Sequence, residues 1–169
     1  VIERRTDHLG ASASGLCRER IHRVRAKRVI LATGALERPL VFAHNDIPGV
    51  MQASSVSAYI VRYGVAPGNR LLLFTNNDNA YQSAIDWHRA GRQVVAIVDS
   101  RRNLRGTMYE TVCELGINVK SGHAVIEAEG GKRVKSARIA LLSAQGAEIE
   151  GRAESVDCDL IACSGGWNP

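Results

Sequence analysis

The chain has 169 residues and a formal net charge of +5, and 45% of its residues are hydrophobic. This length and apolar content suffice to bury a core, as one domain or as a closely packed pair. No apolar run is long enough to cross a membrane, and the first residues show no signal-sequence pattern, so we expect a cytoplasmic protein without a membrane partner.

The positive charge is concentrated in the first part of the chain. Residues 1–38 contain nine Lys or Arg against four Asp or Glu, whereas the remaining residues are balanced. Because this part has no aromatic residues to stack on bases and no recognisable reading helix, we expect no nucleic-acid partner. A solvated strand face, or a surface that meets an acidic protein partner or cofactor phosphates, fits the charge better.

The first elements in chain order are predicted to be strands. Val1–Arg5 is typical of a strand interior, and Thr6–Leu16 has the glycines and small residues of a flexible turn. Ile21–Arg25 alternates apolar with basic residues, which predicts a half-exposed strand. Together they predict the tail of a β-meander.

Residues Lys27–Ala35 are predicted to form a buried strand that ends in Ala-Thr-Gly. Thr33 and Gly34 would then lie at the carboxyl end of a parallel sheet, which is the edge on which such sheets bind ligands. On spacing alone, the stretch fits a cofactor edge and an ordinary strand-end turn about equally well.

The next elements are predicted to be a helix and then a strand-turn-helix-strand unit. Ser54–Tyr63 has apolar residues at helical spacing before Gly64, which is a typical helix stop. Asn69–Thr75 and Gln93–Asp99 are short apolar runs that predict buried strands, and the helix between them ends at Gly91. This order is typical of the start of a dinucleotide-binding domain.

The glycines of that nucleotide-binding pattern are absent. Thr75, Asn77 and Ala80 occupy the three positions of G-x-G-x-x-G/A, and only the last residue fits. A side chain at Asn77 would fill the space where backbone approaches a pyrophosphate, and Asp78, a good helix N-cap, would place negative charge beside the phosphates. A retained scaffold is therefore favoured over an active nucleotide site.

The end of the second strand offers a further alternative. Asp99 could hold ribose hydroxyls, and Arg101 and Arg102 could hold a 2′-phosphate, which would indicate NADP. Without room for the pyrophosphate these contacts would not form in register. A solvated loop at Asp99–Arg102 is the favoured interpretation.

The remaining elements are predicted to be scaffold. A short helix with Met108, Val112 and Leu115 on one face should stop at Gly116. The strands expected after it are 117–120, the hairpin 124–129 and 134–142 with a glycine turn, a third strand at 147–153, and a buried strand at 157–163.

The cysteines and histidines indicate no metal site. Cys17, Cys113, Cys158 and Cys163 have no paired metal-ligand spacing, so buried free thiols are expected. The histidines form no H-x-x-x-H pair. No nucleophile-base pair or carboxylate dyad can be assembled from these spacings, and we expect no catalytic residue.

The longer motifs carry a resemblance to a known family. Arg28–Leu40 is similar to a stretch of pyridine-nucleotide-disulfide-reductase-like flavoproteins. With Asn45–Met51, Arg62–Gly68, Phe74–Asp78 and Ser164–Pro169 added, the chain resembles the alpha subunits of heterotetrameric sarcosine oxidases along nearly its whole length.

The resemblance implies a fold and a function. The fold would be α/β, a Rossmann-like three-layer domain with a β-meander or hairpin layer, as an excised middle piece of a two-dinucleotide-binding-domain flavoprotein. The whole complex would be an oxidoreductase that acts on CH-NH donors with oxygen as acceptor and oxidatively demethylates sarcosine. NAD would be bound by the intact alpha chain, FAD and FMN by the whole complex, and no cofactor by this piece, whose partners would be the beta and other subunits.

The resemblance also implies boundaries and site residues. Residues 1–40 would close the first dinucleotide domain, 41–68 would connect, 69–163 would form the second, glycine-poor domain, and 164–169 would return to the first. The cofactor-binding residues would be Thr33, Gly34, Ala35, Gly165 and Gly166. The alternatives are a piece of an FAD-dependent amino-acid or opine dehydrogenase, and a non-enzymatic interaction scaffold that docks a partner through the basic first part of the chain, which charge reversal at Arg23 and Arg25 would test.

Overall fold

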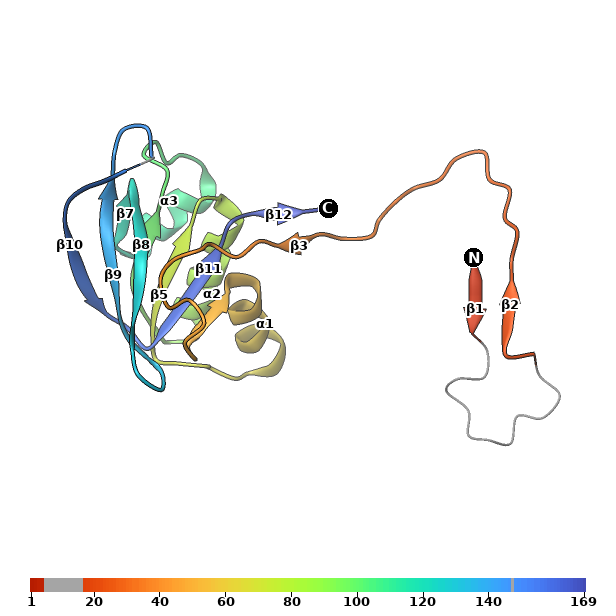
Figure 1. The fold of residues 1–169 in the computed structure, drawn as a ribbon, viewed down its shortest axis with the longest axis horizontal. Helices are drawn as coiled ribbons and strands as arrows, with labels where there is room; N and C mark the ends of the chain where they lie inside the picture. The colour runs from red at the N-terminus through yellow and green to blue at the C-terminus, as the bar shows by residue number, and fades with distance from the viewer. Residues whose placement is uncertain (5–16, 147) are drawn as a thin grey trace. The chain divides into compact units, whose positions relative to one another are not determined.

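The computed structural model describes residues 1–4, 17–146 and 148–169 (Figure 1). Their contacts divide the chain into two units, Val1–Thr33 and Gly34–Pro169. The turn predicted at Thr6–Leu16 lies outside the described residues.

The first unit contains an antiparallel pair of strands. β1 is Ile2–Arg4 and β2 is Glu19–Ile21, with Ile2 opposite Ile21. A strand was predicted here, but the predicted extent of Ile21–Arg25 was wrong. The pairing ends where the His22 backbone N–H donates to the Val1 carbonyl, and no described strand lies opposite the residues that follow.

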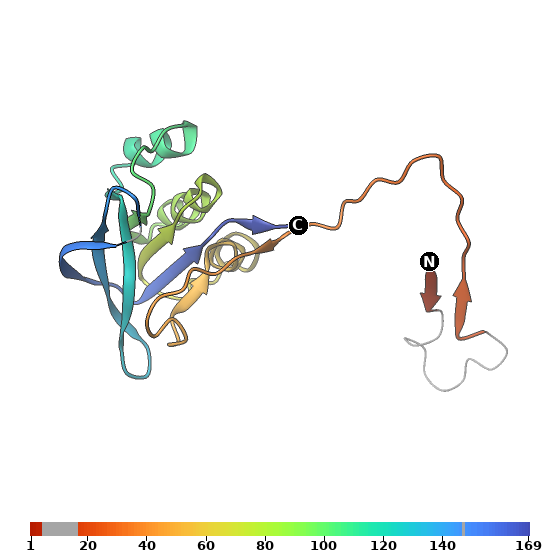
Figure 2. The same cartoon turned by 45° about the horizontal axis from the view of Figure 1, so that its top comes forward.

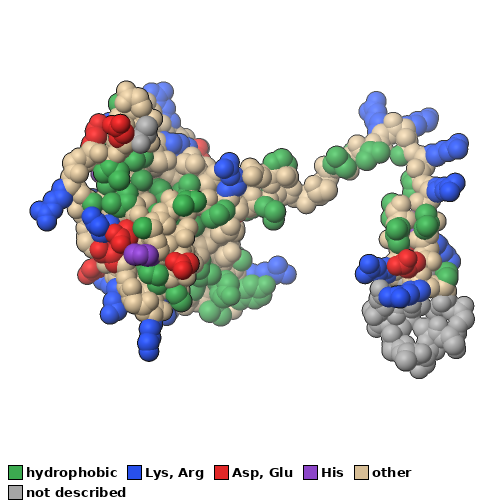
Figure 3. Space-filling model, viewed as in Figure 1, with side chains coloured by type: hydrophobic (Ala, Val, Ile, Leu, Met, Phe, Trp, Pro, Cys, Tyr) green, Lys and Arg blue, Asp and Glu red, His purple; other side chains and the backbone are tan. Residues whose placement is uncertain are grey.

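The buried strand predicted at Lys27–Ala35 is absent from the structure. The segment is irregular, and the side chains of Val29, Ile30 and Leu31 are 75–91% exposed. Figure 3 shows hydrophobic and basic side chains exposed along it. A strand needs a neighbouring strand to pair its backbone N–H and C=O groups, and none of the described strands pairs with this segment.

A parallel five-stranded sheet forms the centre of the second unit. All neighbouring strands in it run in the same direction, so their carboxyl ends meet at one edge. In spatial order the strands are β4 (Val50–Gln52), β11 (Leu160–Ser164), β5 (Arg70–Thr75), β6 (Gln93–Asp99) and β7 (Val119–Ser121).

Helices cover one face of this sheet (Figure 2). They are α1 (Ala53–Tyr63), the short helix η1 (Asp78–Ala80), α2 (Tyr81–Arg89) and α3 (Thr107–Glu114). Gly64 ends α1 in the left-handed conformation with φ 64°, and its N–H donates to the Ile60 carbonyl. The predicted helices and the predicted stop at Gly64 are confirmed.

An antiparallel meander covers the other face. It consists of β8 (His123–Gly130), β9 (Val134–Leu142) and β10 (Ile149–Asp157). The predicted hairpin is confirmed, and the third strand lies closer to the carboxyl end than the predicted range 147–153. A separate two-stranded ribbon pairs β3 (Leu36–Glu37) with β12 (Trp167–Asn168). The predicted three-layer α/β fold is therefore confirmed.

The alternation of side chains on β5 explains its unbroken apolar run. Leu71 and Leu73 pack in the core between the sheet and the helices. Leu72 and Phe74 pack in the core between the sheet and the meander. Because successive side chains point to opposite faces and both faces are covered, each of these positions must be apolar.

Asp159 joins the turn before β11 to the start of β5. Its Oδ1 accepts hydrogen bonds from the backbone N–H groups of Asn69 and Arg70, each at 2.8 Å. Partial burial by itself would raise the pKa of this carboxyl, but the backbone donors of Arg70 and Asn69, together with the Asn69 side chain and the charge of Arg133, lower the pKa below its usual value. The ionised form is therefore the form that the fold favours.

We expect Asp159→Asn to lower the free energy of unfolding by about 1 kcal/mol at pH 7, because the charge-assisted bonds are lost at a partly exposed site. The folded-state pKa is lowered, so this contribution is present above the unfolded value of about 3.9 and is lost as the pH falls through the folded value. Urea titrations should show a smaller difference in the free energy of unfolding between the unaltered chain and Asp159→Asn at pH 3 than at pH 7. Asp157→Asn, at an 80% exposed side chain, should change stability by less than about 0.5 kcal/mol.

Candidate functional site

The turn after β5 is closed by the chain's own hydrogen bonds. Asn77 begins η1: its Oδ1 accepts from the Ala80 backbone N–H at 3.3 Å, while its Nδ2 donates to the Thr75 hydroxyl and to the Ser164 carbonyl, each at 3.1 Å. The Asn77 backbone N–H donates to the Thr75 hydroxyl at 3.0 Å. One amide thus ties the carboxyl ends of β5 and β11 to the helix that follows.

Asn77 stands at the second position of the nucleotide-binding pattern, where that pattern has glycine. Its side chain bonds to Thr75 and Ser164, which are both fully buried. Asn77 is also the N-cap, so the expectation that Asp78 would fill that role was wrong. The short side chain of an Asn can accept a hydrogen bond from the backbone N–H three residues later in the chain, which suits Asn77 to the N-cap position.

Asp78 instead forms an ion pair with an arginine from the next strand end. Arg101 lies 2.7 Å from Asp78 Oδ1 and 2.8 Å from Asp99 Oδ2. Asp99 is fully buried and also accepts from the Tyr81 hydroxyl at 2.9 Å and from the Arg101 backbone N–H at 2.9 Å. These four side chains form a connected network at the carboxyl edge of the sheet.

The network shifts the ionisation of its members in consistent directions. Burial, and then the neighbouring Asp99 carboxylate, raises the pKa of Tyr81 well above its ordinary value. The hydrogen bond to Asp99 is the main cause of the raised pKa of Arg101. Tyr81 therefore stays a neutral donor and Arg101 stays charged throughout the physiological range.

The prediction that Asp99–Arg102 forms a solvated loop was wrong for Asp99, which is buried, and for Arg101, which is paired with Asp99 and Asp78. Asp99 has no exposed surface, and its acceptor oxygens already serve Tyr81 and Arg101. Arg102 is more exposed and donates to the Leu142 carbonyl of the meander. The sequence held no signal for Tyr81 as a partner, because nothing local links it to a residue eighteen positions later.

The structure places the predicted cofactor residues in two settings. Gly165 and Gly166 run beside Arg38: the Gly165 N–H donates to the Arg38 carbonyl at 2.7 Å, and the Arg38 N–H donates to the Gly166 carbonyl at 2.8 Å. A Cβ on Gly165 would lie 3.2 Å from that Arg38 carbonyl oxygen. Thr33, Gly34 and Ala35 lie in the exposed irregular segment.

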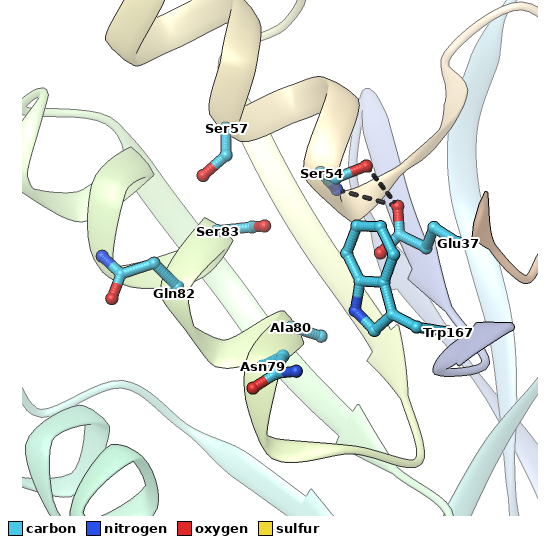
Figure 4. Close-up of a pocket in the computed structure, with 8 residues that line it drawn as sticks. All are labelled: Glu37, Ser54, Ser57, Asn79, Ala80, Gln82, Ser83 and Trp167. Carbon is cyan, nitrogen blue, oxygen red and sulfur yellow. Dashed lines mark hydrogen bonds between the residues drawn. The ribbon is translucent and has the colours of Figure 1, made fainter. Parts of the chain in front are cut away.

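A pocket of about 210 Å³ opens where α1, η1 and α2 begin, beside the β3–β12 ribbon (Figure 4). Glu37 is nine-tenths buried, and its Oε2 accepts from the Ser54 backbone N–H at 3.0 Å and from the Ser54 hydroxyl at 2.5 Å. Glu37 thereby caps α1, whose own N-cap Gln52 makes no side-chain capping bond. The pocket is lined by Glu37, Ser54, Ser57, Asn79, Ala80, Gln82, Ser83 and Trp167.

Sequence reasoning missed this pocket. The lack of an acidic residue in the first turn of α1 was a weak sign that its N-terminus is capped from elsewhere. Nothing in the sequence pointed to Glu37 as the cap, because it comes from a different strand. Trp167 reaches the pocket only because β12 pairs with β3, which sets Trp167 opposite Glu37.

Two cysteines differ from the prediction of buried thiols. Cys17 and Cys113 are exposed, whereas Cys158 and Cys163 are buried. Burial raises the pKa of the Cys158 thiol to about 12 and also raises the pKa of Cys163. Within residues 1–4, 17–146 and 148–169, no three His, Cys, Asp or Glu side chains are grouped to hold a metal ion.

The fold and this edge of the sheet define a class of protein. Thioredoxin reductase from T. acidophilum matches 81% of the chain and 43% of its own chain, with a TM-score of 0.64 and 14% identity. An FAD-dependent pyridine nucleotide-disulphide oxidoreductase from Desulfovibrio vulgaris matches 94% and 39%, with a TM-score of 0.58 and 13% identity. FprA from Mycobacterium tuberculosis in complex with NADPH matches 80% and 49%, with a TM-score of 0.54 and 13% identity. The chain has the pyridine-nucleotide-disulfide oxidoreductase-like fold.

Sequence comparison then gives the particular relatives. The chain is homologous along almost its whole length to one segment of sarcosine oxidase alpha subunits. It is 40% identical to that of Corynebacterium sp. (strain U-96) and 41% identical to that of Rhizobium meliloti (strain 1021), with 99% of the chain covered in each case. It spans only 17% and 16% of those relatives.

A shorter match is to an opine oxidase of Rhizobium meliloti (strain 1021). One polypeptide of that oxidase is 31% identical over 80 residues, which is 47% of the chain and 18% of that relative. No protein-family model matches the chain. No helix in the described part of the chain is long and apolar enough to cross a membrane.

Proposed function

We propose that the chain is a structural unit of the alpha subunit of a sarcosine oxidase-like flavoenzyme complex, with a dinucleotide-binding fold that holds no dinucleotide. Homology to the alpha subunits over 99% of the chain supports the assignment to such a complex. The complex as a whole would oxidatively demethylate sarcosine, with oxygen as the acceptor. The catalytic groups would lie in other parts of the alpha chain and in the beta subunit.

The observation that carries the structural role is the self-satisfied turn at Asn77. Its amide bonds to Thr75, Ser164 and Ala80, and removing it from the turn would break all of these contacts. Asp78 adds a carboxylate at the helix start where a pyrophosphate would need positive charge. The residues present therefore do not fit a dinucleotide at this edge.

In the intact alpha chain, NAD would be held by another dinucleotide unit, and FAD and FMN by the complex. Thr33, Gly34 and Ala35 would contribute to the cofactor edge of that unit, together with Gly165 and Gly166. The exposure of Val29, Ile30 and Leu31 in the irregular segment supports this proposal, because three consecutive apolar side chains of this kind are suited to a buried strand.

Calorimetric titration of the 169-residue chain with NAD⁺ and with NADPH tests the proposal. We expect no saturable heat from either nucleotide, because Asn77 and Asp78 occupy the phosphate position. Micromolar binding of either would contradict the proposal. The variant Asn77→Gly/Asp78→Ser removes both obstacles and should bind NADPH more tightly than the unaltered chain; equal binding after a check of folding by circular dichroism would show that these residues are not the obstacle.

The partial match to the opine oxidase polypeptide supports a second candidate, the same structural role in an opine-oxidising complex. The two candidates differ only in the substrate of the assembled enzyme. Reconstitution of the full-length alpha chain with its partner chains, followed by assays with sarcosine and with an opine, separates them.

A further inference from the structure

The end of α1 presents apolar side chains to solvent. Tyr59, Val61, Tyr63 and Val65 are 43–70% exposed, and they lie in the last turns of this helix or just after it. Figure 3 shows hydrophobic side chains gathered over α1. We call these four residues, with Arg62 among them, the α1 patch. Single exposed apolar side chains are normal, whereas a group of this size is typical of a contact surface.

The tyrosines of the α1 patch do not belong to the core of their own unit. The buried residues of α1 are Ala53 and Val56, and both lie in the core between the sheet and the helices. Ile60 packs against the same core, but Tyr59 and Tyr63 are not part of it. Their aromatic rings are therefore available to another protein surface.

The patch is ordered before any contact is made. The rings of Tyr59 and Tyr63 meet edge to face, with centroids 6.1 Å apart and an angle of 69° between their planes. The Arg62 guanidinium carbon lies 5.6 Å from the centroid of the Tyr63 ring. Tyrosine and arginine often dominate the affinity of protein interfaces, and side chains that are already in place lose less entropy on binding.

The charge of the α1 patch specifies what should cover it. Arg62 is the only charged residue of the patch, and it forms an ion pair with no carboxylate in the described part of the chain. If the patch were covered by apolar groups alone, the guanidinium would be desolvated without a countercharge, which is costly. The covering surface should therefore present apolar side chains and an Asp or Glu.

A second copy of the chain does not fit this requirement. In a symmetric dimer the patch would meet itself, and the two Arg62 side chains would come close together. The exposed apolar side chains present only about 400 Å², whereas each side of a stable interface between separate chains buries about 800 Å². So small a contact does not offset the freedom that two separate molecules lose when they associate.

A contact within one polypeptide avoids most of this cost, because the linked part is held at a high effective concentration. The chain spans only 16–17% of the sarcosine oxidase alpha subunits that it matches. We propose that the α1 patch docks against another part of the same alpha subunit, through a surface with apolar side chains and a carboxylate that meets Arg62. This proposal rests on the proposed function in one respect, that the chain is a unit of such a subunit.

Hydroxyl-radical labelling, read by mass spectrometry, tests the docking. The chain has four tyrosines, of which Tyr59 and Tyr63 belong to the α1 patch and Tyr81 is fully buried. Both patch tyrosines should be labelled in the dilute 169-residue chain. In the full-length alpha chain, without other subunits, their labelling should fall about fivefold. Tyr81 should stay unlabelled in both samples, which controls for folding.

Three results would overturn the proposal. The patch tyrosines could be labelled equally in both chains, or they could be protected only after the partner chains are added. They could also be protected in the 169-residue chain in proportion to its concentration, which would indicate self-association. Sarcosine turnover is a separate readout: a reconstituted complex that protects the tyrosines but does not oxidise sarcosine contradicts the proposed function and supports the docking.

Arg62→Glu tests the carboxylate on the opposite surface. In the full-length alpha chain it should raise the labelling of Tyr63 severalfold, because two negative charges would then meet. Arg89→Glu is the matched control, since Arg89 is also an exposed arginine in the last turn of a helix, α2, but is not part of the patch. It should leave Tyr63 protected, and Tyr81 should stay unlabelled in both variants. Equal labelling of Tyr63 in the two variants would overturn the proposal.

Discussion

Arg101→Met is expected to lower the free energy of unfolding by about 3 kcal/mol, because it leaves the buried Asp99 carboxylate without its countercharge. Asp99 has no exposed surface, and Arg101 supplies two side-chain donors to it, at 3.1 and 2.8 Å. The Tyr81 hydroxyl and the backbone N–H of residue 101 would still donate to Asp99, but neither carries the positive charge that compensates a buried carboxylate. Methionine retains most of the aliphatic packing of arginine, so the loss reports mainly on the charge. Urea unfolding followed by Trp87 emission measures it.

Arg105→Met is the matched control for this variant. Arg105 is exposed on the same connection between β6 and α3, and its replacement should change stability by less than about 0.5 kcal/mol. If the two variants lose similar stability, Asp99 does not depend on Arg101. Part of the Arg101 side chain is exposed, so a loss well above about 3 kcal/mol is not expected.

Gly130→Ala is expected to cost about 3 kcal/mol, because the β8–β9 hairpin has no room for a methyl group at this position. A Cβ on Gly130 would lie 2.0 Å from the Arg133 carbonyl oxygen, which is backbone and cannot rotate away. The φ of Gly130 is 156°, a conformation that residues with a Cβ rarely adopt. Thermal and urea unfolding should both show the loss.

Gly131→Ala is the control in the same turn. A Cβ there meets no atom within 4 Å, and Gly131 does not have a positive φ. Its replacement should be neutral, or slightly stabilising through the reduced freedom of the unfolded chain. Equal losses at the two glycines would contradict the steric explanation and would point to a general requirement for flexibility in the turn.

Arg101 forms ion pairs with carboxylates from two segments at the carboxyl edge of the sheet. Asp78 supplies a negative charge at the start of η1, and Arg101 contacts it at 2.7 Å. The chain's own carboxylate thus satisfies an arginine at the edge of the sheet where this fold class can bind phosphates.

Much of the fold could be predicted because its signals are local. The unbroken apolar run on β5 predicts a strand covered on both faces, and the structure places Leu72 and Leu73 in the two separate cores. Glycines at the ends of helices marked the stops of α1 and α3, because a left-handed residue is needed there. The absence of glycines after β5 is also a local signal, and the obstructed nucleotide turn that it predicts stays a prediction.

The candidate site could be predicted only in part. Asn77 was identified as an obstacle, but its bonds to Ser164 join residues 87 positions apart. The role of Glu37 also depends on a contact between distant residues, because its carboxylate caps a helix that begins sixteen residues later. The failure at Lys27–Ala35 has a related cause, since an apolar run indicates a strand but does not reveal whether a partner strand is present.

The amino-acid sequence by itself determined the strand-turn-helix-strand order around β5 and β6, the helix stops and the place of Asn77 in the turn after β5, because periodicity and turn residues are properties of neighbouring residues. Only the tertiary structure decided that Asp99 is buried with Arg101 and Tyr81, and that Glu37 and Trp167 meet at one pocket. These contacts depend on which strand ends share an edge of the sheet, and strand pairing between distant segments is set by the packing of the whole chain.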